Sequence, residues 1–178
     1  RTAAWVGGDV KLSASNSLHV RASASILRYD TPDTLNTDDR DELYLTLHAE
    51  DIQQLGSSMR LLVGLDLSAS HLVYLSRFQS ANNAWNRVIR LYGQVNAQPT
   101  NSIENVVRAE VIGNYTASDY EEQVAAVRSF SFRQAAWYDS LSIRLTSRIV
   151  AVASAGVRIS ERGALRWREF TERPEDEI

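Results

Sequence analysis

The sequence of 178 residues contains no cysteine, only three prolines and a single lysine, Lys11. The absence of cysteine excludes a disulfide scaffold and a thiolate metal site. No apolar run approaches the roughly 18 residues that a membrane-spanning helix needs, so a helical membrane protein is excluded. The net charge of −3 and the lack of a basic run argue against a nucleic-acid partner.

What the sequence does contain is a two-residue alternation of apolar and polar side chains, repeated along most of the chain. In residues 43–50, leucines and an alanine occupy the odd positions, and tyrosine, threonine, histidine and glutamate occupy the even ones. A period of two places successive side chains on opposite faces of a β-strand. Each such strand therefore has one apolar and one polar face, and helical periodicity is weak throughout.

The pattern predicts an all-β, antiparallel up-and-down meander of about eight strands in a domain at 1–170, followed by an acidic tail or loop at 171–178. Within the seventh predicted strand the apolar residues change from even-numbered to odd-numbered positions. We therefore predict a β-bulge near Gln134 to Tyr138. The predicted strands are Trp5–Ala14, Leu18–Tyr29, Leu43–Asp51, Met59–Leu75, Ala84–Ala97, Asn105–Thr116, Val127–Leu145 and one that begins near Ile149.

Alternation alone is compatible with two opposite arrangements. In a soluble lipocalin-like barrel the apolar face points inward, whereas in an outer-membrane barrel it points to lipid. Three features favour the membrane: the near absence of lysine, short turns that alternate with longer loops, and aromatic residues near predicted strand ends. Ordinary β-propensity also accounts for the aromatic residues. These residues are Trp5, Tyr29, Trp85, Tyr115, Tyr120, Trp137 and Trp167.

In these three respects the chain resembles bacterial outer-membrane β-barrel proteins over nearly its whole length. The resemblance implies a place in the outer membrane of a Gram-negative bacterium, with the lipid bilayer as a partner. It also implies a non-enzymatic, porin-like role without a cofactor, as a pore, a scaffold or an anchor for other envelope proteins. Such barrels close with a strand that ends on an aromatic residue, for which the candidate is Phe170, followed here by eight more residues.

The order of turns bears on whether this barrel is complete. Because the first connection is short, both chain ends are expected on the rim that carries the long loops. A complete barrel of the family is expected to have both ends on the other rim. We therefore predict a transmembrane segment of a larger barrel, which needs further strands, rather than a barrel closed by these eight strands alone.

Charged residues recur on the polar parity of several predicted strands, and their signs nearly balance. Inside a narrow lumen each charge would lose much of its water, so we predict a paired lumen charge network rather than an active site. Its members are Arg21, Glu50, Asp66, Arg90, Arg108, Glu110 and Arg158.

Three other groups suggest chemistry. His48, Asp66 and Ser68 share a parity and suggest an outer-membrane hydrolase, although no nucleophile-elbow motif is present. The three histidines are not placed within reach of one metal. The acidic run 38–42 lacks the ligand spacing of a calcium loop and is better interpreted as a solvated loop. The alternatives are thus a soluble barrel that binds an apolar ligand and, second, a hydrolase.

Overall fold

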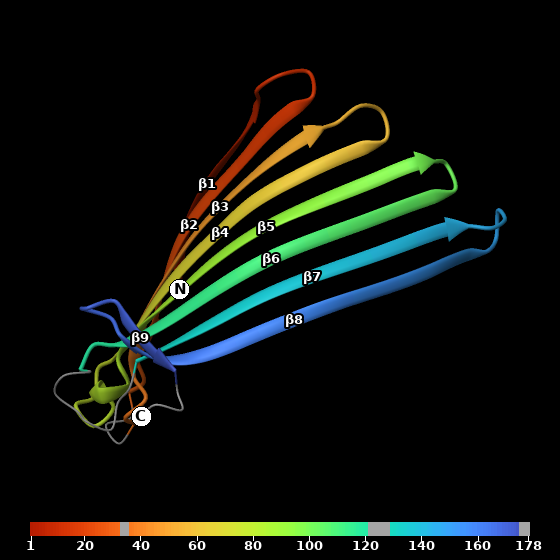
Figure 1. The fold of residues 1–178 in the computed structure, drawn as a ribbon. Coiled ribbons are helices and arrows are strands. Elements are labelled where there is room, and N and C mark those ends of the chain that lie inside the picture. The colour runs from red at the N-terminus through yellow and green to blue at the C-terminus, as the bar shows by residue number, and fades with distance from the viewer. Residues whose placement is uncertain (33–35, 121–128, 175–178) are drawn as a thin grey trace.

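The computed structural model describes residues 1–32, 36–120 and 129–174, most of which belong to one antiparallel sheet (Figure 1). Its nine strands lie in chain order, each hydrogen-bonded to the next, which confirms the all-β meander. No helix among the described residues is long and apolar enough to cross a membrane. The elements are β1 (Thr2–Lys11), β2 (Asn16–Tyr29), β3 (Arg40–Gln54), β4 (Met59–Tyr74), η1 (Ser80–Asn82), β5 (Ala84–Thr100), β6 (Ile103–Ser118), β7 (Phe130–Arg144), β8 (Val150–Arg166) and β9 (Thr171–Pro174).

Tight turns join the strands at one end of the sheet, which we call the hairpin end, and longer connections join them at the other, the loop end (Figure 1). The turns cover 12–15, 55–58, 101–102 and 145–149. β1 starts at the loop end, because Thr2 pairs with Ile26 near the end of β2, and β8 finishes there. This agrees with the expectation that both chain ends lie on the rim of the long loops.

The sheet is not closed. Among the described residues β1 pairs only with β2, while β8 pairs with β7 and, over four residues, with β9. The accessible surface is 12321 Å², whereas a compact protein of 19.9 kDa exposes about 8,700 Å². Both faces of the sheet are therefore largely open, and only Tyr92, Ala117, Ala136 and Leu165 are buried apolar residues among those described.

The structure corrects the predicted bulge. β7 pairs with β6 and β8 in unbroken register, through Gln134 to Tyr138. The parity of the apolar residues switches because Phe130 and Phe132 lie on the polar side of the sheet near the loop end, where the Arg162 guanidinium carbon lies 4.6 Å from the Phe130 ring centroid. Aromatic side chains thus occupy a polar face without any backbone irregularity.

The structure also corrects the predicted tail. Thr171–Pro174, expected in the acidic tail or loop, form β9, which pairs with residues 163–166 of β8. Phe170 ends the intervening turn with a φ of 47°. Residues 33–35, 121–128 and 175–178, which include parts of two predicted loops, the beginning of the seventh predicted strand and the end of the tail, lie outside the described residues.

Candidate functional site: the two faces of the sheet

The strand register assigns every side chain to one of two faces, because directly opposite residues of an antiparallel pair share a face. One face carries the even-numbered residues of β1 and β2 and the odd-numbered residues of β3 to β8; we call it the apolar face. The opposite side is the polar face. The predicted separation of apolar and polar residues is therefore confirmed on the long strands other than β7, where Phe130 and Phe132 lie on the polar face.

An uncovered apolar belt crosses the apolar face. On most strands it contains four or five alternate side chains, which span seven to nine residues, close to the nine to eleven residues of a strand that crosses a bilayer. Ile89, Val111 and Ile159 remain 44%, 50% and 70% exposed. The belt comprises the face-sharing residues within 18–26 of β2, 43–49 of β3, 61–69 of β4, 89–97 of β5, 107–113 of β6 and 151–159 of β8.

Polar residues bound this belt at both ends. The hairpin-end boundary includes Asn16, Asp51 and Asn105, with Asn16 Nδ2 3.4 Å from Asp51 Oδ2. The loop-end boundary is formed by Arg28, Asp41, His71, Arg87, Arg133 and Glu161. The apolar surface is therefore a band of limited width rather than a whole face.

The belt runs obliquely to the strands. Successive register partners connect Lys11, the last residue of β1, with Ile52 of β3 and Tyr138 of β7. β3 continues two residues beyond this row, to Gln54, and β7 continues six, to Arg144. The hairpins thus rise by about 20 Å across the sheet, which inclines the strands by about 35°.

The loop-end boundary shows the same stagger. Successive register partners connect Arg133, the boundary residue of β7, with Ala22 of β2. The boundary residue of β2 itself, Arg28, lies six residues closer to the loop end than Ala22. Both edges of the belt therefore shift by six residues in the same direction, and the band keeps its width across the sheet.

Asp139 of β7 is the exception, since it lies on the apolar face with Leu141 and Ile143 beyond it toward the hairpin end. Asn105 of β6 donates a hydrogen bond from Nδ2 to its carboxylate at 2.7 Å. The pair gives this part of the belt a polar contact between neighbouring strands.

Aromatic and cationic side chains gather on the apolar face at the loop end. Trp85 stacks on His71 with ring centroids 4.3 Å apart, and His71 Nε2 lies 2.8 Å from Asp119. The Arg87 guanidinium carbon lies 5.0 Å from the Trp85 ring centroid and 4.0 Å from that of Trp167. Such contacts between cations and indole rings are attractive.

The turn between β8 and β9 covers this corner of the apolar face. Trp167 and Phe170 contact Tyr115 of β6, with ring centroids 6.4 and 5.9 Å from it. Leu165 is 2% exposed below them. Aromatic residues therefore collect near strand ends as predicted for Trp85, Tyr115 and Trp167, whereas the prediction is wrong for Trp137, which lies in the middle of β7.

The polar face has a charged cluster around Tyr92 of β5, a residue that the sequence analysis did not single out. Its hydroxyl donates to Glu50 Oε2 at 2.6 Å. The guanidinium carbons of Arg108 and Arg90 lie 4.4 and 5.2 Å from its ring centroid. Tyr92 is 8% exposed, so this cluster shields its centre from water.

Ion pairs extend the cluster. Asp66 lies 2.5 Å from His48 Nδ1 and 2.7 Å from Arg90 Nη2. Arg108 Nη2 lies 3.2 Å from Glu110.

All seven residues of the predicted charge network lie on the polar face, and five of them, Glu50, Asp66, Arg90, Arg108 and Glu110, meet around Tyr92. The other two lie toward the edges of the sheet. Arg21 of β2 is paired in register with Gly7 and His48. Arg158 of β8 donates from Nη2 to the Tyr138 hydroxyl at 2.9 Å.

The geometry does not assemble the hydrolase group. Ser68 shares the face of His48 and Asp66 but is paired in register with Thr46 and Val88. Each histidine instead contacts an aspartate: His19 with Asp9, His48 with Asp66 and His71 with Asp119. In the described part of the chain, no three histidine, cysteine or acidic residues form a group able to hold a metal ion.

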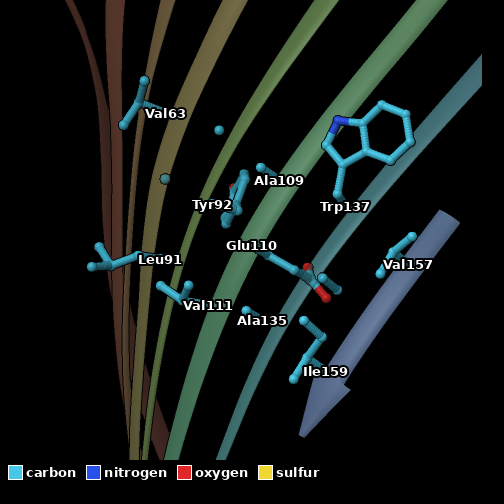
Figure 2. Close-up of a pocket in the computed structure, with 13 residues that line it drawn as sticks. Val63, Leu91, Tyr92, Ala109, Glu110, Val111, Ala135, Trp137, Val157 and Ile159 are labelled. Carbon is cyan, nitrogen blue, oxygen red and sulfur yellow. The ribbon is translucent and has the colours of Figure 1, made fainter.

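A shallow depression of about 600 Å³ lies over the apolar belt between β4 and β8 (Figure 2). Val63, Leu91, Val111 and Trp137 are among the residues that line it. Its lining is almost wholly apolar, so hydrocarbon suits it better than a polar substrate.

No protein-family model, curated protein or solved structure matches this chain. The two faces and their boundaries are therefore the features on which a functional proposal rests.

Proposed function

We propose that this chain forms part of the wall of a bacterial outer-membrane β-barrel, with the apolar face toward lipid and the polar face toward the lumen. The observation that carries the proposal is the oblique apolar belt, which is partly or fully exposed on every strand and is bounded by polar residues at both ends. Lipid is the solvent that matches a band of this width, since an outer-membrane barrel has an apolar band about 25 Å tall.

The strand inclination supports the same proposal. The stagger of hairpins and boundaries corresponds to about 35°, which lies at the lower end of the 35–45° by which strands tilt in barrels. In a barrel of inclined strands, a lipid layer of constant height covers residues that shift along the chain from one strand to the next. The six-residue stagger between the boundary residues Arg28 and Arg133 is a shift of this kind.

The polar face suits the lumen of such a barrel. Glu50, Asp66, Arg90 and Arg108 are held by partners on neighbouring positions, and their charges offset one another. A barrel with more than eight strands has room for water along this face. We propose a non-enzymatic role as a pore, a scaffold or an anchor, and the charged cluster then sets the polarity of the lumen wall.

Fluorescence from single tryptophans tests the orientation. Trp137 lies on the apolar face between the belt residues Ala109 and Val157, while Trp5 lies on the polar face. One variant keeps only Trp137 and replaces Trp5, Trp85 and Trp167 by phenylalanine; the matched variant keeps only Trp5. In vesicles whose acyl chains carry bromine at mid-chain, we expect strong quenching of Trp137 and weak quenching of Trp5.

Two results would count against the proposal. Quenching of neither tryptophan, with the chain folded and monomeric in detergent-free buffer, favours the soluble barrel with its apolar face inside. Quenching of Trp5 but not Trp137 reverses the orientation. Far-ultraviolet circular dichroism of both variants checks that the sheet has formed.

A further inference from the structure

Arg87 of β5, at the loop-end boundary of the apolar belt, has a guanidinium group with an unfilled place for a hydrogen-bond acceptor. The group contacts the rings of Trp85 and Trp167. Neither indole satisfies its N–H groups, because the polar atom of an indole is a donor only. Among the described residues, the Arg87 side chain has no hydrogen bond or ion pair, and its Nη1 atom is buried. A buried donor without an acceptor is costly, and a ligand oxygen can supply what is missing.

The carboxylates near Arg87 are held by other groups. Asp119 lies 2.8 Å from His71 Nε2, and Glu172 of β9 forms an ion pair with Arg133 of β7. Arg87, unlike Arg133, therefore lacks an anionic partner. Phosphate is the complementary ligand, because its oxygens match the fork of N–H groups that a guanidinium presents.

A groove in the apolar belt leads to this corner of the sheet. A second depression, of about 400 Å³, adjoins the one in Figure 2. The two depressions share Leu91, Val111, Ala135 and Ile159. The second one reaches Tyr115, which is directly opposite Arg87 in the register. The joined groove therefore runs from Trp137 to the loop-end boundary, where Arg133 and Glu161 bring opposite charges to its mouth.

We propose that this corner binds a membrane lipid whose headgroup contains phosphate, with a phosphate oxygen at Arg87 and one acyl chain in the groove. The inference rests on the proposed function, because it needs the apolar face to meet lipid. In a bilayer, phosphate headgroups lie at the level where aromatic and basic residues flank the apolar band. One ligand then fills the groove and gives the guanidinium the acceptor that it lacks.

The two parts of the site act on different parts of the ligand. A lipid without phosphate can fill the groove but leaves Arg87 unsatisfied. Inorganic phosphate can reach Arg87 but gains nothing from the apolar groove. We therefore expect tight binding only where one molecule carries both the phosphate and the acyl chain.

Native mass spectrometry of the chain in a neutral detergent tests this selectivity. The probes are phosphatidylethanolamine, which carries phosphate without net charge, diacylglycerol with the same acyl chains, and inorganic phosphate. We expect one tightly bound phosphatidylethanolamine and binding of diacylglycerol that is weaker by about tenfold or more. Inorganic phosphate at equal concentration should not displace the phospholipid. Equal binding of diacylglycerol, or displacement by inorganic phosphate, would overturn the inference.

Two pairs of variants test the residues. Arg87→Gln should weaken phosphatidylethanolamine binding by about tenfold or more, whereas Arg28→Gln, at the same boundary but in β2, should not. Ala135→Leu fills the groove and should also weaken binding. Its matched control is Ala153→Leu, on the belt outside the groove lining. Unchanged binding by Arg87→Gln, or equal losses within either pair, would contradict the proposed site.

Circular dichroism of each variant checks that the sheet has formed. The comparison of the three probes uses the unmodified protein, so it decides the inference even if Arg87→Gln fails to fold. Trp137 quenching in brominated vesicles separates the two proposals. Quenching without selective phospholipid binding removes only the lipid site, and loss of both removes the membrane role as well.

Discussion

The ring of Tyr92 in β5 fills the space that a side chain at Gly64 in β4 would need. The two residues are directly opposite each other on the polar face, and a Cβ built at Gly64 would lie 2.2 Å from Tyr92 Cζ. A second pair, Tyr138 of β7 and Gly156 of β8, repeats the arrangement, with 2.9 Å between such a Cβ and Tyr138 Cδ1. An aromatic ring that covers a glycine on the neighbouring strand fixes register and replaces the packing that the glycine lacks.

We expect Gly64→Ala to lower the free energy of unfolding by about 1–3 kcal/mol, since the added methyl group displaces the Tyr92 ring from a packed position. Gly8→Ala is the matched control, because nothing lies within 4 Å of a Cβ at that position. Urea titration of both variants in the same detergent measures the difference. Equal stability of the two would show that Tyr92 moves aside at no cost.

The side chains of Arg108 and Glu110 should stabilise the folded protein through their interaction with each other. The Glu110 side chain is 13% exposed and that of Arg108 28%, so this pair lies between buried and exposed extremes. Breaking a buried pair costs about 3–5 kcal/mol and an exposed pair contributes about 1 kcal/mol or less. We expect a coupling energy of about 1–3 kcal/mol from the double-mutant cycle of Arg108→Ala and Glu110→Ala.

The matched control for this cycle is Arg166 and Glu169, whose side chains are 71% and 63% exposed at 4.0 Å. Their cycle should give less than about 1 kcal/mol. A similarly small value for Arg108 and Glu110 would mean that water screens this pair fully, and that the cluster around Tyr92 does not stabilise the sheet through its ion pairs.

The sequence predicted the strands and the assignment of all seven charges to one face, because the period-two pattern alone determines both. It missed β9, which is only four residues long and too short for a periodic signal. It also placed a bulge in β7, since Phe130 and Phe132 resemble belt residues when judged by hydrophobicity. The centre of the cluster at Tyr92 depends on a glycine 28 positions earlier in the chain, and only the register brings the two together.

A charged side chain placed on the apolar belt should destabilise the folded protein. Ala153 lies on the belt in β8, and Ser154, the next residue, lies on the polar face. In lipid vesicles we expect Ala153→Arg to lower the free energy of unfolding by about 2–4 kcal/mol, the cost of arginine near the bilayer midplane. Ser154→Arg should cost less, because the polar face carries arginines already. Similar small effects of both variants would contradict the lipid-facing orientation.

Removing one residue of the Asn105–Asp139 pair should destabilise the protein more than removing both. Asn105→Val removes the donor 2.7 Å from the Asp139 carboxylate and leaves that group unsatisfied on the apolar face, at a cost of about 1–3 kcal/mol. Replacing both residues by valine removes the polar groups together, and valine suits a strand that faces lipid. We therefore expect Asn105→Val with Asp139→Val to be about as stable as the unmodified protein, measured by urea unfolding in vesicles. If the double variant is less stable than the single one, the pair does not lie in hydrocarbon but contacts water or another polar surface at the hairpin end.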